Sequence, residues 1–251
     1  MTDKRLFRGA AGYYARFRRG YPDELLQLLA ERAGLDGTGR LLDLGCGTGQ
    51  LAIPLAVRVE EVVAVDSEPG MLAELRTSAP SNVRAVEARA EDVDESWGAF
   101  RLVTIGRAFH WLDGPLVLDR LSRVTTQVAL VGDTTEQSEA QSSLLAVARE
   151  LFGERPAMRQ PTVRYAQALA ASPFSDVIEL SVDEERTWTI DQLIGLAYST
   201  SFASLERVGD RREEFERALR ARLKPHYRER VSVEALLGRR SGGSRYERLE
   251  P

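Results

Sequence analysis

Three glycines stand at alternate positions directly behind an apolar run, in the stretch LLDLGCGTGQLA at residues 41–52. The apolar run predicts a short buried strand, and the residues behind the last glycine predict a helix. Glycines at 45, 47 and 49 let the backbone turn tightly and pass close to a ligand, while amides at the start of a helix point outward. The stretch therefore predicts a strand, a turn and a helix that hold a nucleotide or another cofactor, or else a tight turn with no ligand.

Short apolar runs alternate with amphipathic stretches along the first half of the chain. This alternation indicates a mostly parallel sheet covered by helices on both faces. Strands are expected at 40–44, 61–66, 82–88, 100–107 and 127–133. Helices are expected at 23–34, 50–58, 69–79 and 115–124.

The pattern changes after residue 133, where helical periodicity dominates. Helices are expected at 139–154, 189–205 and 211–227, and strands at 176–188 and 230–240. The sequence shows no internal repeat, so a single domain of residues 1–251 is expected. Its expected parts are an N-terminal lid and helix at 1–34, a cofactor-binding core at 35–133, a helical insert and substrate lid at 134–225, and a final strand with a tail at 226–251.

The composition limits the function classes that fit this chain. With 251 residues, 43% hydrophobic and 29% charged, it is sized for one large soluble α/β domain. A net charge of −4 argues against a nucleic-acid partner, and no apolar run is long enough to cross a membrane. The single cysteine, Cys46, excludes an internal disulfide and a cysteine-built metal cage. We expect a cytoplasmic protein with a small-molecule partner and no metal, either a monomer or a homodimer.

Asp66 is the expected partner of the glycine turn. It ends the second predicted strand, 21 residues after Gly45, where a carboxylate can accept hydrogen bonds from both hydroxyls of an adenosine ribose. An alternative is that Asp66 caps the following helix. A dinucleotide site needs its third glycine three residues after the second, whereas Gly47 and Gly49 are two apart. This spacing disfavours a nicotinamide oxidoreductase.

These stretches carry a resemblance to a known family. LLDLGCGTG, VVAVDSEPGML and VRAVEARAEDV resemble the first three motifs of class I S-adenosylmethionine-dependent methyltransferases. AGYYARFRRGYPDELL and AFHWLD resemble its small-molecule branch, known as methyltransferase type 11 or trans-aconitate-methyltransferase-like. The resemblance covers most of residues 7–133 and the later helices loosely. It implies a Rossmann-like fold with a seven-stranded, mostly parallel sheet whose last strand is antiparallel.

The resemblance also implies an activity and a set of cofactor contacts. The activity is methyl transfer from S-adenosylmethionine to N, O or C of a metabolite, with secondary metabolism as one setting; a cofactor-binding regulator without transfer would share the motifs. Arg89 departs from the common form, which has an acidic residue at this position. The implied contacts are Asp43, Gly45 and Gly47 at the methionine end, Asp66 with Ser67 at the ribose, Met71 against adenine, and Ala90 with Glu91 at the adenine edge.

The segment GYYARFRRGYP at 12–22 is dense in aromatic and basic residues. In the resembling family this segment folds over the cofactor as part of a lid. Tyr14 and Arg18 are expected at the cofactor, and Tyr13 and Tyr21 are expected to position the acceptor. Arg16, Arg18 and Arg19 are the candidates to pair with a carboxylate of cofactor or substrate. The alternative is a solvated basic stretch.

His110 follows the fourth predicted strand, at the sheet edge where ligands bind in such folds. An imidazole there can serve as a general base or position the acceptor. Alternatively, His110 and Trp111 form a structural pair. Phe109 and Trp111 are expected to contact the substrate. Trp188, Tyr198 and Phe202 in the helical insert are further pocket candidates, unless they belong to the core.

Overall fold

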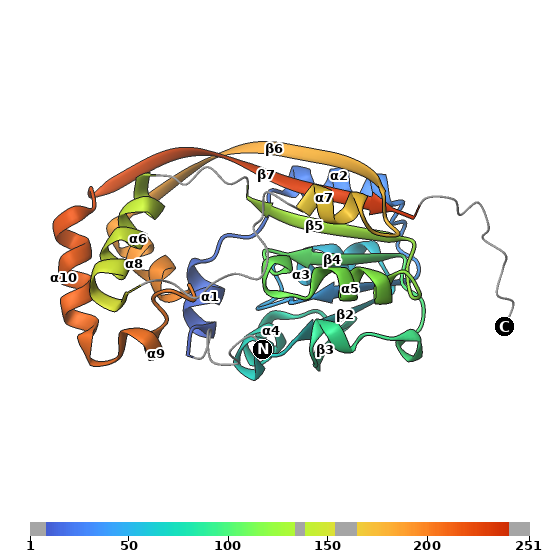
Figure 1. Cartoon of the computed structure of the whole chain (residues 1–251), viewed down its shortest axis with the longest axis horizontal. Coiled ribbons are helices and arrows are strands. Elements are labelled where there is room, and N and C mark those ends of the chain that lie inside the picture. Colours follow the sequence, from blue (N-terminus) through green and yellow to red (C-terminus); the bar gives the residue numbers. More distant parts are fainter. Residues whose placement is uncertain (1–8, 134–138, 154–164, 241–251) are drawn as a thin grey trace, which may run out of the picture.

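The computed structural model describes residues 9–133, 139–153 and 165–240. Its centre is a seven-stranded sheet with the order β3-β2-β1-β4-β5-β7-β6 (Figure 1). The strands are β1 (Arg40–Leu44), β2 (Glu61–Asp66), β3 (Val83–Glu87), β4 (Leu102–Gly106), β5 (Gln127–Asp133), β6 (Asp176–Thr189) and β7 (His226–Arg239). The first five are parallel, and β7 runs antiparallel to both neighbours. The predicted fold class, including the antiparallel last strand, is confirmed.

Helices cover both faces of this sheet. One face carries α2 (Asp23–Ala33), α3 (Ala52–Leu55) and α4 (Pro69–Ser78), and the other carries α5 (Gly114–Leu121) and α7 (Tyr165–Ala170). Successive strand residues point to opposite faces. Leu41 therefore packs in the apolar core beneath α2, α3 and α4, and Leu42 packs in the core beneath α5 and α7. Strands buried on both faces explain the unbroken apolar runs in the sequence.

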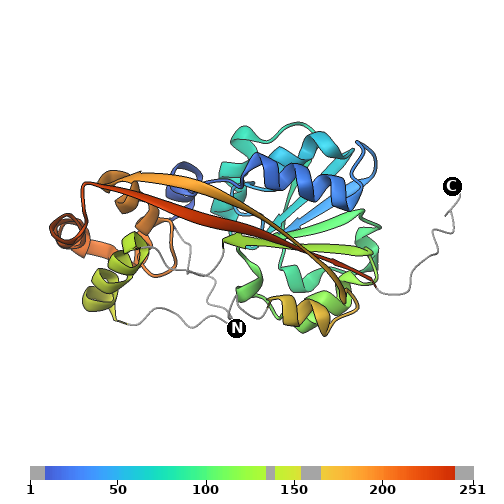
Figure 2. The ribbon, with the colours of Figure 1, turned by 90° about the horizontal axis from the view of Figure 1, so that it is seen from above.

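Strands β6 and β7 form a long two-stranded antiparallel ribbon, which we call the hairpin. It connects the sheet to a separate helical layer. β6 and β7 pair over their whole length, from Asp176 opposite Arg239 to Thr189 opposite His226, but β5 pairs only with residues 233–239 of β7. About half of the hairpin therefore extends beyond the sheet (Figures 1 and 2). Its far end carries α6 (Glu139–Phe152), α8 (Ile190–Tyr198), α9 (Leu205–Val208) and α10 (Arg212–Arg222). We call these four helices the lid.

The lid has its own apolar core, centred on Tyr198 and Phe215. The first helix, α1 (Ala11–Phe17), lies between the lid and the sheet (Figure 1). Among the described residues, no helix is both long and apolar enough to cross a membrane.

Three helices are shorter than the periodicity predicts. The helix expected at 211–227 ends at Arg222, and residues 226 and 227 belong to β7. The stretch expected as one helix at 189–205 divides after Tyr198, because the hydroxyls of Ser199 and Thr200 donate to the carbonyls of Leu196 and Ala197. Such bonds compete with helix continuation. The helix expected at 50–58 is a short α3 followed by a 3₁₀ turn. The tail at 241–251 lies outside the described residues.

Candidate active site

Asp66 ties the ends of β1 and β2 together. The amide of Gly47 donates to Oδ2 of Asp66 over 2.9 Å, and the amide of Glu68 donates to Oδ1 over 2.9 Å. Burial raises the pKa of Asp66, and these two amides oppose that rise. Each carboxylate oxygen has a second lone pair, so Asp66 can still accept a hydrogen bond from a ligand. The cap of α4 is Glu68, whose Oε1 accepts from Gly70, so the alternative of Asp66 as the cap is wrong.

The first two glycines of the turn are required by their surroundings. Gly45 and Gly47 have φ values of 66° and 54°, which L-residues with a side chain rarely adopt. A Cβ on Gly45 would lie 2.6 Å from the Cβ of Ala108, at the end of β4. A Cβ on Gly47 would lie 3.4 Å from the ring of Tyr14 in α1. The turn is therefore closed from two sides by elements that are distant in sequence.

Asp43 lies directly below this turn and is 1% exposed. The hydroxyl of Thr104 on β4 donates to its Oδ1 over 2.8 Å. Burial raises the pKa of Asp43 to about 7, against the effect of the Thr104 hydrogen bond. A carboxyl group at this position can therefore change its charge near neutral pH.

This pKa predicts a pH-dependent stability. Between about pH 4 and pH 7 the folded protein holds a proton that the unfolded chain, with an ordinary pKa of 3.8, has released. The stabilisation from this proton is complete below pH 4 and is lost as the pH rises through 7. Asp43→Asn removes it, so urea unfolding from pH 5 to pH 8 should show wild-type stability falling relative to the variant, by at most about 1.4 kcal/mol per pH unit. Parallel pH curves would contradict this.

The residues expected at the ribose and adenine follow β2 and β3 along the same edge. Ser67 is exposed, Met71 is buried in α4, and Ala90 is buried in the 3₁₀ turn after β3. Glu91 accepts from the amide of Asp113 over 3.2 Å and pairs with Arg89 over 3.3 Å. Burial acts to raise the pKa of Glu91, but these partners lower it overall.

Helix α1 brings Tyr14 and Arg18 to the turn. The Tyr14 ring faces Gly47, and the Arg18 guanidinium lies 5.3 Å from the centre of that ring. Arg18 Nε donates to the hydroxyl of Ser199 in the lid over 3.1 Å. Its two terminal nitrogens have no acceptor in the described part of the chain, and burial lowers its pKa. Arg18 is thus a half-buried guanidinium whose terminal nitrogens have no acceptor among the described residues.

Tyr13 lies on the other side of α1, because neighbouring helix residues point about 100° apart. Its ring packs against Tyr198 at 5.1 Å, and its hydroxyl accepts from Arg212 over 3.2 Å. This placement differs from the acceptor-positioning role that we expected. Tyr13 fastens α1 to α8 and α10 instead.

Gly195 sets how closely α1 and α8 approach. A Cβ at this position would lie 2.5 Å from the ring of Phe17 in α1. Gly195→Ala should therefore displace α1, destabilise the protein by about 1–3 kcal/mol, and speed tryptic cleavage after Arg16. Gly132→Ala in β5 is the control, because a Cβ there has no atom within 4 Å. Equal cleavage and unfolding curves for the two variants would contradict a tight α1–α8 contact.

His110 is held by a tyrosine that is distant in sequence. The hydroxyl of Tyr165 in α7 lies 2.8 Å from Nδ1 of His110 and accepts from its backbone amide over 3.0 Å. The imidazole is 4.8 Å from the Trp111 ring, centre to centre. Phe109 is fully buried and meets the Tyr165 ring edge-on. The prediction that Phe109 contacts substrate is wrong in this structure, because the 3₁₀ turn at 109–111 directs its ring into the core.

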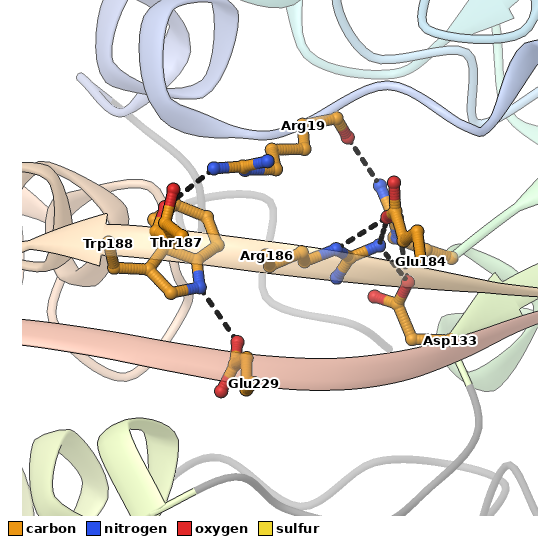
Figure 3. A network of polar contacts seen from close by, with 8 residues as sticks. Arg19, Asp133, Glu184, Arg186, Thr187, Trp188 and Glu229 are labelled. Atoms are coloured by element: carbon orange, nitrogen blue, oxygen red, sulfur yellow. Dashed lines mark hydrogen bonds and ion pairs between the residues drawn. The ribbon is translucent and has the colours of Figure 1, made fainter.

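A cavity of about 160 Å³ lies between the sheet edge and the lid. Arg107 follows β4, Asp133 ends β5, and Arg186 comes from β6, so the three reach it from separate elements. Figure 3 shows Asp133 and Arg186 close together. Arg107 Nη2 and Arg186 Nη2 both bind Oδ1 of Asp133, over 3.0 and 2.9 Å. Burial acts to raise the pKa of Asp133, but the two guanidiniums lower it to about 2. None of these three residues was predicted from the sequence.

Arg107 also fixes Tyr21. Its guanidinium lies 4.4 Å from the centre of the Tyr21 ring and donates to the carbonyl of Arg19 over 2.8 Å. The Tyr21 hydroxyl packs so close to Gly106 that a Cβ there would lie 2.5 Å away. Burial raises the pKa of Tyr21, so its phenol stays neutral at physiological pH.

The expected pocket residues of the insert divide between cavity and core. Trp188 and Phe202 line the cavity at Arg107 and Arg186, which we call the arginine cavity. Tyr198 is instead 1% exposed in the lid core. Arg18 lines this cavity and also a more open one of about 400 Å³, which reaches the outer side of the glycine turn at Thr48. Neither cavity includes Asp66 or Glu91 in its lining, so the cofactor assignment rests on the turn and strand ends.

Comparison with known proteins agrees with this arrangement. The model of a methyltransferase domain family matches residues 41–127. Uncharacterized methyltransferases of Mycobacterium tuberculosis and Mycobacterium bovis are each 33% identical over 199 residues, covering 78% of this chain and 76% of the relative. The chain belongs to the class I S-adenosylmethionine-dependent methyltransferases. This methyltransferase is also 25% identical to an uncharacterized methyltransferase-like protein of Schizosaccharomyces pombe, over 80% of each chain.

Solved structures are similar to this methyltransferase over most of its length. A protein of Anaeromyxobacter dehalogenans described as a type II methyltransferase has a TM-score of 0.58 and 25% identity, covering 89% of this chain and 98% of that one. The YcgJ protein of Bacillus subtilis has a TM-score of 0.56 at 15% identity and shares the fold, over 88% and 100% of the two chains.

Proposed function

We propose that this methyltransferase binds S-adenosylmethionine at the glycine turn and transfers its methyl group to N, O or C of a small molecule held under the lid. The observation that carries the proposal is the hydrogen bond from Gly47 to Asp66. It supports a cofactor site in which the glycine turn and a carboxylate able to accept from ribose hydroxyls lie at one sheet edge. The arginine cavity beside it supports a compact acceptor.

The residues present fit the cofactor. The two terminal nitrogens of Arg18 have no acceptor in the described part of the chain and can bind the carboxylate at the methionine end of the cofactor. Asp66 has acceptor capacity for the ribose hydroxyls of the cofactor. Gly45 and Gly47 carry no Cβ, so the turn keeps room for the methionine end of the cofactor where a side chain would meet Ala108 or Tyr14. When bound, the cofactor supplies a methyl group on a positively charged sulfur.

The chain contributes to transfer by positioning and by excluding water. Tyr14 and Arg18 link the turn to the lid, so α1 is placed to cover both ligands. His110 is a positioning residue in this proposal, because Tyr165 holds its Nδ1 and fixes the ring. Tyr21 remains neutral and packs under Arg107, which lines the cavity proposed for the acceptor.

Two measurements test the proposal. Calorimetric titration should show binding of S-adenosylhomocysteine, and binding of NADH with no response to S-adenosylhomocysteine would overturn it. Incubation with methyl-labelled cofactor and a broad metabolite panel should then label at least one acceptor. Cofactor binding with no label on any compound would instead favour a cofactor-binding regulator.

A further inference from the structure

The charges around the arginine cavity are unequal. Arg107 and Arg186 share the carboxylate of Asp133, and Arg186 also pairs with Glu184 over 2.5 Å. These two cations are balanced by two carboxylates. Arg18 and Arg19 also line the cavity, and neither has a carboxylate partner in the described part of the chain.

Two contacts orient Arg19, although no carboxylate pairs with it in the described part of the chain. Its Nη2 donates to the carbonyl of Thr187 over 2.7 Å, and its guanidinium lies 4.6 Å from the centre of the Trp188 ring. Trp188 is itself fixed, because its Nε1 donates to Glu229 over 2.7 Å (Figure 3). A cation that is stacked and oriented in this way loses little side-chain freedom when it binds an anion.

We propose that the cavity takes acceptors with one negatively charged group on a compact apolar body, and that Arg19 binds this group. The inference rests on the proposed function, because it reserves Arg18 for the carboxylate of the cofactor. One uncompensated cation then remains on the acceptor side, which favours a single negative charge over several. The guanidinium offers a carboxylate two parallel donors.

The size and the remaining walls of the cavity define the rest of the acceptor. Its volume of about 160 Å³ is close to the roughly 150 Å³ of an apolar cavity that binds benzene. Its apolar lining is Leu144, Leu145, Leu196, Phe202 and the Trp188 ring. An aromatic or short aliphatic body fits this lining, and a bulky ligand such as a peptide or a nucleotide does not.

Benzoate and its neutral isostere benzamide probe this site directly. Each is titrated calorimetrically into the full-length protein saturated with S-adenosylhomocysteine. We expect benzoate to bind at least 10-fold more tightly than benzamide, because the amide leaves Arg19 without a counter-ion. Equal affinities would overturn the proposal, and this comparison needs no variant.

The Arg19→Gln variant tests whether Arg19 is the residue that binds the carboxylate of benzoate. The variant should lose at least 10-fold in benzoate affinity and retain wild-type affinity for benzamide. Arg228→Gln is the matched control, because Arg228 lies on the hairpin that carries Thr187 and Trp188 and pairs with exposed Glu185. It should bind both probes as wild type does. If the melting temperature shows that Arg19→Gln is unfolded, Arg19→Lys replaces it. This variant should weaken the binding of benzoate and leave the binding of benzamide unchanged. Unchanged benzoate binding in the folded variant would overturn the role of Arg19.

Two further anions test the charge. Phenyl phosphate separates a phosphate from a carboxylate, and citrate tests a polyanion; tighter binding of either than of benzoate would overturn the assignment of one carboxylate-like charge. The S-adenosylhomocysteine titration that precedes each experiment keeps the two proposals separate. Its failure would remove the proposed function, whereas intact cofactor binding without a preference for benzoate would remove only this inference.

Discussion

Asp133→Ala is expected to lower the free energy of unfolding by about 3 kcal/mol at neutral pH, in the range measured when one partner of a buried ion pair is removed. The side chains of Arg107 and Arg186 are 12% and 5% exposed, and both bind the same oxygen of Asp133, which is 27% exposed, so the loss should lie at the lower end of that range. Glu184 remains for Arg186, but the variant leaves Arg107 with no carboxylate among the described residues. Urea unfolding at pH 7 measures the loss.

The pH dependence of this loss gives an independent check. The pKa of Asp133 is lowered from 3.8 to about 2 in the folded protein, so its stabilisation is complete above pH 4 and is lost as the pH falls through 2. The difference between wild type and variant should be constant from pH 6 to 8 and shrink below pH 4. Asp183→Ala is the control: Asp183 pairs with exposed Arg230 on the same hairpin, and its loss should cost under about 1 kcal/mol. Equal losses in both variants would contradict a special role for Asp133.

The glycine turn and its partner could be predicted because their geometry is local. A strand buried on both faces reads as an unbroken apolar run, and parallel strands bring their carboxyl ends to one edge. Gly47 and Asp66 each follow such a run, so their meeting follows from the strand pattern alone, and the structure gives the 2.9 Å hydrogen bond. Both long strands were predicted, but their pairing was not, and β7 begins at His226 instead of residue 230. The charged residues before Val231 give this part of β7 no apolar pattern.

The arginine cavity could not be predicted in this way. Arg107 meets Asp133 across 26 residues and the carbonyl of Arg19 across 88, so no local period joins them. The chain is rich in arginine, and nothing in composition separates a buried arginine from a solvated one. Two signals were available: Asp133 ends a strand at the same edge as Asp66, and Arg186 lies in a strand at a position that points inward. The predicted roles of Tyr13 and Phe109 differ from the structure for a similar reason. The direction of a side chain on a short helix or turn depends on tertiary packing, which the local sequence does not show.

Asp66→Ala is expected to weaken S-adenosylhomocysteine binding by roughly 1.5–3 kcal/mol, or about 10- to 150-fold, since charge-assisted hydrogen bonds to both ribose hydroxyls would be lost. The same carboxylate accepts the amides of Gly47 and Glu68, so the variant also loses local order. Asp94→Ala is the matched control, because Asp94 also accepts a backbone amide, that of Ser96 over 2.9 Å, and is not among the residues assigned to the cofactor. It should leave the dissociation constant unchanged.

A change of ligand separates the ribose contact from the local order. In competition against S-adenosylhomocysteine, wild type should bind adenosine more tightly than 2′,3′-dideoxyadenosine, which lacks both hydroxyls. In Asp66→Ala this preference should vanish, because the two changes remove the same hydrogen bonds and their effects are then not additive. If the variant keeps the wild-type preference for adenosine, Asp66 does not bind the ribose, and its role is confined to holding the glycine turn against β2.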